Sequence, residues 1–160
     1  MPDPTQRDAR DAEAGNGMRV LTLTQPWASL VVLGCKTLET RSWYTTYRGP
    51  LLIHAAKGYP ASARMQVTHP RFSDALTAEG QDPHTLPLGV ILGQVTLTDV
   101  REVASPSVRA ILEARHDEEG FGNYAPGRFA WLLTTPVRFD THIPARGALG
   151  LWTYQAMAVT

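Results

Sequence analysis

Residues 24–43 read TQPWASLVVLGCKTLETRSW, and this stretch decides how the rest of the chain is interpreted. It joins a short helix, a glycine turn and a charged strand. Gln25, Lys36, Glu39 and Arg41 all fall within it. A purely structural segment has little reason to collect so many polar groups, so we expect the functional site in this stretch.

The helix is expected to follow Thr24, because a threonine before a proline at an early helical position is typical of a helix cap. It should run for about eight residues and stop at Gly34. Trp27 then falls on the same face as Leu30. This spacing predicts that the indole ring of Trp27 packs in the core.

Charged side chains alternate along the strand that follows the glycine turn. Side chains on a strand point to opposite faces in turn, so Glu39 and Arg41 share one face. Lys36 lies at the turn, and its long stem can bring the ammonium to that face. The sequence therefore predicts a Lys–Glu–Arg cluster. Its structural interpretation is a surface salt bridge worth at most about 1 kcal/mol.

Working outward, strands outnumber helices. RVLTLT starts a first strand at Met18, LLIHAAKG is a buried strand, and LGVILGQVTLTDVREV is expected to be the central strand. Pro70 divides residues 60–80 into two short helices, and Ser105 should cap another helix. We expect EEGFGNYAPG to be a loop. The last third should form two or three strands split by Pro136 and Pro144.

The length of 160 residues and the 43% hydrophobic content fit one domain, which we assign to residues 18–156. Residues 1–17 have almost no apolar side chains and are predicted to be a disordered tail. Lysine plus arginine equal aspartate plus glutamate, at 15 each. Positive residues nevertheless prevail between positions 36 and 64, which predicts a basic face.

The rest of the composition mainly excludes features: an intrachain disulfide, a membrane span, a metal site and a bound cofactor. With one cysteine, Cys35, the chain forms no intrachain disulfide, which fits a reducing compartment, and we expect the cytoplasm. No apolar run reaches the length of a membrane span, so we expect no membrane partner. The histidines are scattered and no glycine-rich phosphate loop occurs, so we predict no metal and no cofactor.

The order of these residues resembles a known family signature. Gly34, Lys36, Glu39 and Arg41 match the glycine, x, lysine, two residues, glutamate, x, arginine pattern of the ASCH domain, the activating-signal-cointegrator homology domain. Gln25-Pro26-Trp27 precedes the pattern and Ser42-Trp43-Tyr44 follows it. The later strands are similar as well, so the resemblance covers residues 18–154.

The resemblance implies an α+β, PUA-like fold, a small, partly open β-barrel whose openings are covered by short helices. It also implies a basic cleft beside the first helix that binds RNA or another single-stranded nucleic acid, with DNA possible, in RNA metabolism, translation or transcription. Stacking aromatics and phosphate-binding cations complete this interpretation. The predicted nucleic-acid-binding residues are Gln25, Lys36, Arg41, Ser42, Trp43, Tyr47, Arg48, His54 and Lys57.

An enzyme is the alternative. In a metal-independent ribonuclease, Lys36, Glu39 and Arg41 would be catalytic, with Glu39 as general base and His54 as proton donor. Relatives that act as amidohydrolases on acylated cytidine carry a threonine three residues after the lysine, where this chain has Glu39, and this departure counts against that activity. A protein-interaction adaptor is a third class, for which no sequence feature argues directly.

Overall fold

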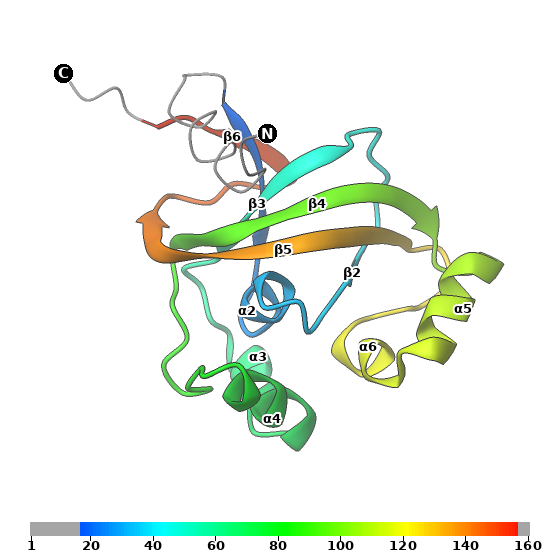
Figure 1. The fold of residues 1–160 in the computed structure, drawn as a ribbon, viewed down its shortest axis with the longest axis horizontal. Helices are drawn as coiled ribbons and strands as arrows, with labels where there is room; N and C mark the ends of the chain where they lie inside the picture. Colours follow the sequence, from blue (N-terminus) through cyan, green and yellow to red (C-terminus); the bar gives the residue numbers. More distant parts are fainter. Residues whose placement is uncertain (1–16, 157–160) are drawn as a thin grey trace, which may run out of the picture.

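The computed structural model describes residues 17–156, so the predicted tail lies outside the described residues except for Gly17. These residues form one mixed sheet flanked by short helices, which confirms the α+β class (Figure 1). The six strands follow the order β2-β5-β4-β3-β1-β6. Their bounds are β1 Met18–Leu23, β2 Leu38–Arg41, β3 Gly49–Ala55, β4 Val90–Glu102, β5 Phe129–Pro144 and β6 Leu151–Tyr154.

The sheet curls strongly but is not closed into a barrel. Strand β1 runs parallel to β3, whereas the other neighbouring strands pair in antiparallel fashion. Strand β4 lies between β3 and β5, as expected for the central strand. Arg41 at the end of β2 donates a hydrogen bond from Nη2 to the carbonyl oxygen of Thr22 in β1, at 3.1 Å. This bond spans the open side of the sheet, between strands that are not neighbours in it.

The helices gather on one side of the sheet (Figure 1). Helix α2 packs against β3, β4 and β5, where Ala28, Val31 and Val32 join the main core together with the fully buried Trp131. Helices α3 and α4 form the predicted pair of short helices around Pro70. The helix bounds are α2 Trp27–Val32, α3 Ala61–Gln66, α4 Pro70–Ala78, α5 Pro106–Ala114 and α6 His116–Phe121. No helix in residues 17–156 is long and apolar enough to cross a membrane.

Helix α2 begins later and is shorter than the sequence indicated, with six residues. Thr24 is not its cap. Instead Gln25, which is fully buried, accepts a hydrogen bond at Oε1 from the backbone N–H of Ser29 at 3.0 Å. Its Nε2 donates to the Ser29 hydroxyl and to the carbonyl of Pro87. The amide side chain supplies both the acceptor that the helix start needs and donors for its neighbours.

Strand β5 passes through Pro136 without ending, contrary to the expected break. The pairing with β4 shifts register here, because Gln94 pairs with Val137 whereas Thr96 pairs with Thr134. Thr135, in the left-handed region with φ 50°, and Pro136 are the extra residues of this irregularity. A proline is tolerated at a bulge because its missing N–H is not needed in the ladder. Pro144 does end the strand.

The predicted loop EEGFGNYAPG was wrong over its first residues, because α6 occupies His116–Phe121. Three acidic residues stand in the first turn of α6, where they complement the helix dipole. Glu118 and Phe121 are buried on the inner face of the helix. The segment is rich in charged residues and has no apolar periodicity, so hydrophobic periodicity does not predict this helix or its buried face.

Candidate functional site

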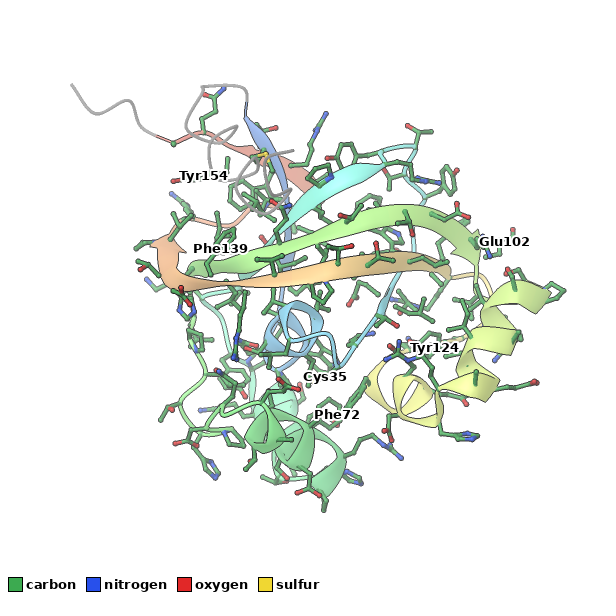
Figure 2. The ribbon with its side chains drawn as sticks, in the orientation of Figure 1. Cys35, Phe72, Glu102, Tyr124, Phe139 and Tyr154 are labelled. Carbon is green, nitrogen blue, oxygen red and sulfur yellow. The ribbon has the colours of Figure 1, made fainter. Side chains whose placement is uncertain are left out.

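A cleft of about 310 Å³ lies between α2, β2, α4 and the chain that follows α6. Its polar border includes Lys36, Glu39 and Arg128, and its apolar border includes Trp27 and Phe72. Figure 2 shows Phe72 and Tyr124 on the helical side of the sheet, in the region of this cleft. The cleft lies beside α2, the first helix of the described chain, and Arg41 does not line it directly.

The predicted Lys–Glu–Arg cluster is present. Lys36 Nζ lies 4.0 Å from Glu39 Oε2, and Arg41 Nε lies 3.9 Å from Glu39 Oε1. The Lys36 side chain is only 1% exposed and that of Glu39 13% exposed. Alternation along β2 therefore places Glu39 and Arg41 on one face, and the turn carries Lys36 to it. Burial distinguishes this cluster from an exposed salt bridge.

Three charged atoms at the cluster are buried and have no hydrogen-bond partner among residues 17–156: Glu39 Oε2, Arg41 Nε and Arg128 Nε. Arg128 is anchored at its other end, where Nη2 donates to the carbonyl of Thr40 at 3.0 Å. Buried polar groups are normally hydrogen-bonded, since leaving one unpaired costs free energy. Of these residues Glu39 and Arg128 line the cleft, so it offers one acceptor and one donor without a hydrogen bond and is suited to a ligand that carries both kinds of group.

Lys36 is held in place by its surroundings. Its ammonium donates to the carbonyl of Leu38 and lies 5.8 Å from the ring centroid of Tyr124. A Cβ atom added at Gly122 would lie 3.2 Å from Lys36 Nζ, so the glycine leaves room for the ammonium. Burial, reinforced by the carboxylates of Glu118 and Glu39, raises the pKa of Tyr124 well above its usual range, so its hydroxyl stays protonated.

The turn that carries Lys36 is fixed by Glu118 of α6. The Oε1 atom of Glu118 accepts hydrogen bonds from the backbone N–H and from the hydroxyl of Thr37, the latter at 2.6 Å. The Thr40 hydroxyl donates to the carbonyl of Asn123 at 2.7 Å. Both threonine hydroxyls near the cluster are therefore engaged with the segment around α6, and β2 is fastened to that segment.

An aromatic wall faces the charged groups. Trp27 Nε1 donates to the carbonyl of Phe121 at 2.6 Å, and the Trp27 ring meets that of Phe72 edge to face at 6.1 Å. Phe72 meets Phe121 at 5.2 Å. Trp27 thus packs as the helical spacing predicted, and it also borders the cleft.

The other predicted binding residues near β2 lie outside the cleft. Gln25 is committed to α2, as described above, and Ser42 is exposed. Trp43 meets Trp131 edge to face at 4.8 Å and packs against the main core. The rings of the 42–47 segment thus serve mainly to hold that segment on the sheet, apart from Tyr44, which is 51% exposed.

Tyr47 and Arg48 support the same segment. The Tyr47 hydroxyl donates to the carbonyl of Pro50. Arg48 donates to the carbonyls of Thr45 and Tyr47, both at 2.8 Å, and pairs with Asp99 at 3.4 Å. The positive residues between positions 36 and 64 therefore do not form the single basic face that their spacing predicted.

His54 and Lys57 border a different hollow, together with Thr22 and Arg146. His54 is buried, its Nδ1 lies 3.1 Å from the Thr22 hydroxyl, and its Nε2 lies 2.7 Å from the carbonyl of Ala145. This arrangement fits a neutral imidazole with its proton on Nε2, accepting from Thr22 and donating to Ala145. Burial lowers the pKa of His54, although the bond to Ala145 opposes the shift.

Sequence reasoning missed the contributions that come from far along the chain. Arg128, Phe72, Glu118 and the 120–123 segment all belong to the cleft or hold its turn in place. The only local signal was the glycine- and aromatic-rich composition of EEGFGNYAPGR, which preceded a strand. Among residues 17–156, no group of three or more His, Cys, Asp or Glu side chains is arranged to hold a metal ion.

The class of the protein is shown by comparison with known families. The family model described as the ASCH domain matches residues 21–141, and the chain belongs to this family.

Within the family, the chain is 36% identical over 149 residues to activating signal cointegrator 1 from Homo sapiens, and 28% identical to the protein of that name from Mus musculus. The match covers 91% of this chain but only 24% of either relative. Among solved structures, ASCH from Zymomonas mobilis is similar, with 16% identity, a TM-score of 0.46, and coverage of 79% of this chain and 73% of that one. A tyrosine-to-phenylalanine mutant of that protein gives the same TM-score.

Proposed function

We propose that this domain binds single-stranded nucleic acid, with RNA preferred to DNA, by taking one unpaired nucleotide into the cleft beside α2. The observation that carries the proposal is that two residues lining the cleft, Glu39 and Arg128, each have a buried charged atom, Oε2 and Nε respectively, without a hydrogen-bond partner among residues 17–156. A role in RNA metabolism, translation or transcription agrees with the family and with relatives named as a signal cointegrator.

The chemistry of the cleft is complementary to a nucleotide. The Glu39 oxygen is an acceptor for a base N–H group or a ribose 2′-hydroxyl, and Arg128 offers a donor for a base carbonyl or a phosphate. Two cations, Lys36 and Arg128, border the cleft against the single carboxylate of Glu39, so it is net positive. Nucleic-acid backbones favour such a site, and the affinity should fall as salt is added.

The aromatic wall and the size of the cleft support the same ligand. Single-stranded bases are recognised when they splay out and lie against aromatic side chains, and the half-buried ring of Trp27, backed by Phe72 and Phe121, borders the cleft. The volume of about 310 Å³ lies at the lower end of the range for small-molecule pockets. It suits one nucleotide and excludes a duplex.

The test is a fluorescence-anisotropy titration of labelled single-stranded RNA and DNA at two salt concentrations, with strand integrity followed on gels. Lys36→Met and Arg128→Gln remove one cation each with little change of shape, and we expect each to weaken binding about tenfold or more. Arg109→Gln, at an exposed position on α5, is the control and should change the affinity less than about twofold. Thermal unfolding of each variant shows whether the fold survives.

Absence of binding by the wild-type protein at low salt would contradict the proposal. Equal losses in Arg109→Gln and Arg128→Gln would also contradict it, because binding would then depend on total charge.

A hydrolase in the same cleft is the second candidate, and it rests on the buried Lys36–Glu39 pair. Two observations weigh against it. His54, the expected proton donor, borders the other hollow and has both ring nitrogens engaged. The hydroxyls of Thr37 and Thr40 donate to Glu118 and Asn123, which leaves neither poised as a nucleophile. Strand cleavage that disappears in Glu39→Gln while binding persists would establish the hydrolase instead.

A further inference from the structure

A second hollow lies at the end of β3, outside the cleft beside α2. Two adjoining cavities, of about 430 and 660 Å³, share Lys57, Arg146 and Gly147 in their walls. The first also reaches down to Thr22 and His54. Residues of the 144–150 segment, PARGALG, form the opposite side.

The charge of this hollow is positive and uncompensated. The side chains of Lys57 and Arg146 are exposed, and neither forms an ion pair or a hydrogen bond with any residue in the described range 17–156. Within the described part of the chain, no aspartate or glutamate borders either cavity. Arg48 and Arg101, by contrast, both contact Asp99. Two exposed cations that line the same hollow without a carboxylate beside them favour the binding of an anion there.

The floor of the hollow is built by close packing. A Cβ atom at Gly147 would lie 2.8 Å from His54 Cε1 and 3.0 Å from the Thr22 hydroxyl oxygen, so only glycine allows the segment to approach so closely. Trp152 Nε1 donates to that same hydroxyl at 2.9 Å, and the ring of Trp152 meets that of His54 edge to face at 5.6 Å. The backbone next to Arg146 is therefore packed against a rigid floor that carries no charged side chain, formed by Thr22, His54 and Trp152.

Thr22 connects this hollow with the cleft beside α2. Its hydroxyl contacts His54, while its carbonyl accepts the hydrogen bond from Arg41. Arg41 in turn lies 3.9 Å from Glu39, which borders the cleft. The two sites are thus neighbours across the open side of the sheet, with the Arg41 guanidinium between them.

We infer that Lys57 and Arg146 form a second subsite, which binds a backbone phosphate of the same single strand whose nucleotide occupies the cleft beside α2. This inference rests on the proposed function. A strand that runs from the cleft past Arg41 toward Thr22 would reach this hollow, and phosphate contacts by Lys and Arg fix the register of a nucleic acid without reading its sequence. The cleft then selects the nucleotide, and the subsite increases the affinity only for an oligonucleotide long enough to reach it.

The experiment compares a single nucleoside monophosphate with a labelled single-stranded RNA of about ten nucleotides, a length within the site sizes of single-strand binders. The double variant Lys57→Gln/Arg146→Gln is measured against the control Arg109→Gln/Arg115→Gln, which removes two exposed cations from α5 and the residue after it. We expect the first double variant to bind the RNA about tenfold more weakly, with a salt dependence shallower by about 0.7 in logarithmic slope, because one phosphate contact is lost. Its affinity for the monophosphate should be unchanged, and the control should resemble wild type.

An RNA with uncharged methylphosphonate linkages identifies the phosphate as the group that is bound. Wild type should bind this RNA more weakly, and the Lys57→Gln/Arg146→Gln change should then have no further effect.

If wild-type protein binds RNA and the double variant binds it equally well, the second subsite is refuted while the proposed function stands. If the double variant loses the monophosphate to the same extent as the RNA, the subsite is not separate and the inference also fails. If wild type binds neither ligand, the proposed function itself fails.

Discussion

Glu118 accepts two hydrogen bonds from Thr37, at the turn that carries Lys36 to the cleft. The carboxylate is almost completely buried, with a residue exposure of 1%. A buried carboxylate held by two donors is costly to disturb, because removing it leaves a backbone N–H without a partner. Glu118 therefore positions the lysine without itself bordering the cleft.

Glu118→Ala should lower the free energy of unfolding by about 2–3 kcal/mol, since two hydrogen bonds to a charged group are lost. Glu119→Ala, at the exposed position next to it, should change the free energy by less than about 0.5 kcal/mol. Urea unfolding measures both. Equal effects of the two substitutions would contradict the role assigned to Glu118.

His54 should make the fold sensitive to mild acid. Its folded-state pKa is lowered from the ordinary value of 6.5 by burial, so the unfolded chain takes up a proton more readily. The stability linked to His54 is fully present above pH 6.5 and is lost as the pH falls below that value. Unfolding midpoints between pH 7.5 and 5.5 should therefore decrease in wild type and in His84→Gln, and decrease less in His54→Gln. A slope that His54→Gln leaves unchanged would refute this.

At the residue scale, strand alternation was enough to predict which charged side chains lie together on one face of β2. Glu39 and Arg41 share a face because they are two positions apart, and Lys36 joins them through its long stem. Glu118 and Arg128 were not predicted because their partners lie far away in the sequence, 81 positions for the Thr37 bond and 88 for the Thr40 bond. Spacing rules do not extend over such separations.

Helix α2 and its exit turn connect the core with the charged strand. Gly34 has φ 78°, in the left-handed region, and a Cβ atom there would lie 3.1 Å from the Pro136 ring at the β5 irregularity. The sequence predicted a glycine stop at this position, and backbone conformation is the reason for it. The later start of the helix was not predicted, because a buried glutamine at the helix start has no common sequence signature.

Gly34→Ala should lower the free energy of unfolding by about 1–2 kcal/mol, because a left-handed conformation is unfavourable for any residue with a Cβ atom. Gly58→Ala is the matched control: a Cβ atom there has no neighbour within 4 Å and its φ is not in the left-handed region. This control should be neutral within about 0.5 kcal/mol. A neutral Gly34→Ala, measured by denaturant unfolding, would show that the turn relaxes without cost.

On the scale of the whole molecule, the curled sheet brings its two ends together at the site. Strand β2 is at one edge and β1 is next to the other edge, yet the Arg41–Thr22 hydrogen bond joins them. The predominance of strands and the central strand were predictable from the hydrophobic pattern, and the α+β class from the family resemblance. The meeting of β2 and β1 depends on the curl of the entire sheet, which no local pattern specifies.

The four tryptophans provide the most direct test of where the ligand binds, because each indole N–H gives its own signal in a ¹⁵N–¹H correlation spectrum. Trp27 borders the cleft and donates to Phe121, Trp152 lies beneath the second hollow, and Trp131 is fully buried in the core. Titration with a nucleoside monophosphate should shift the Trp27 signal and leave the Trp131 and Trp152 signals in place. A saturating titration in which the Trp27 signal stays fixed while another indole shifts would contradict binding in the cleft beside α2.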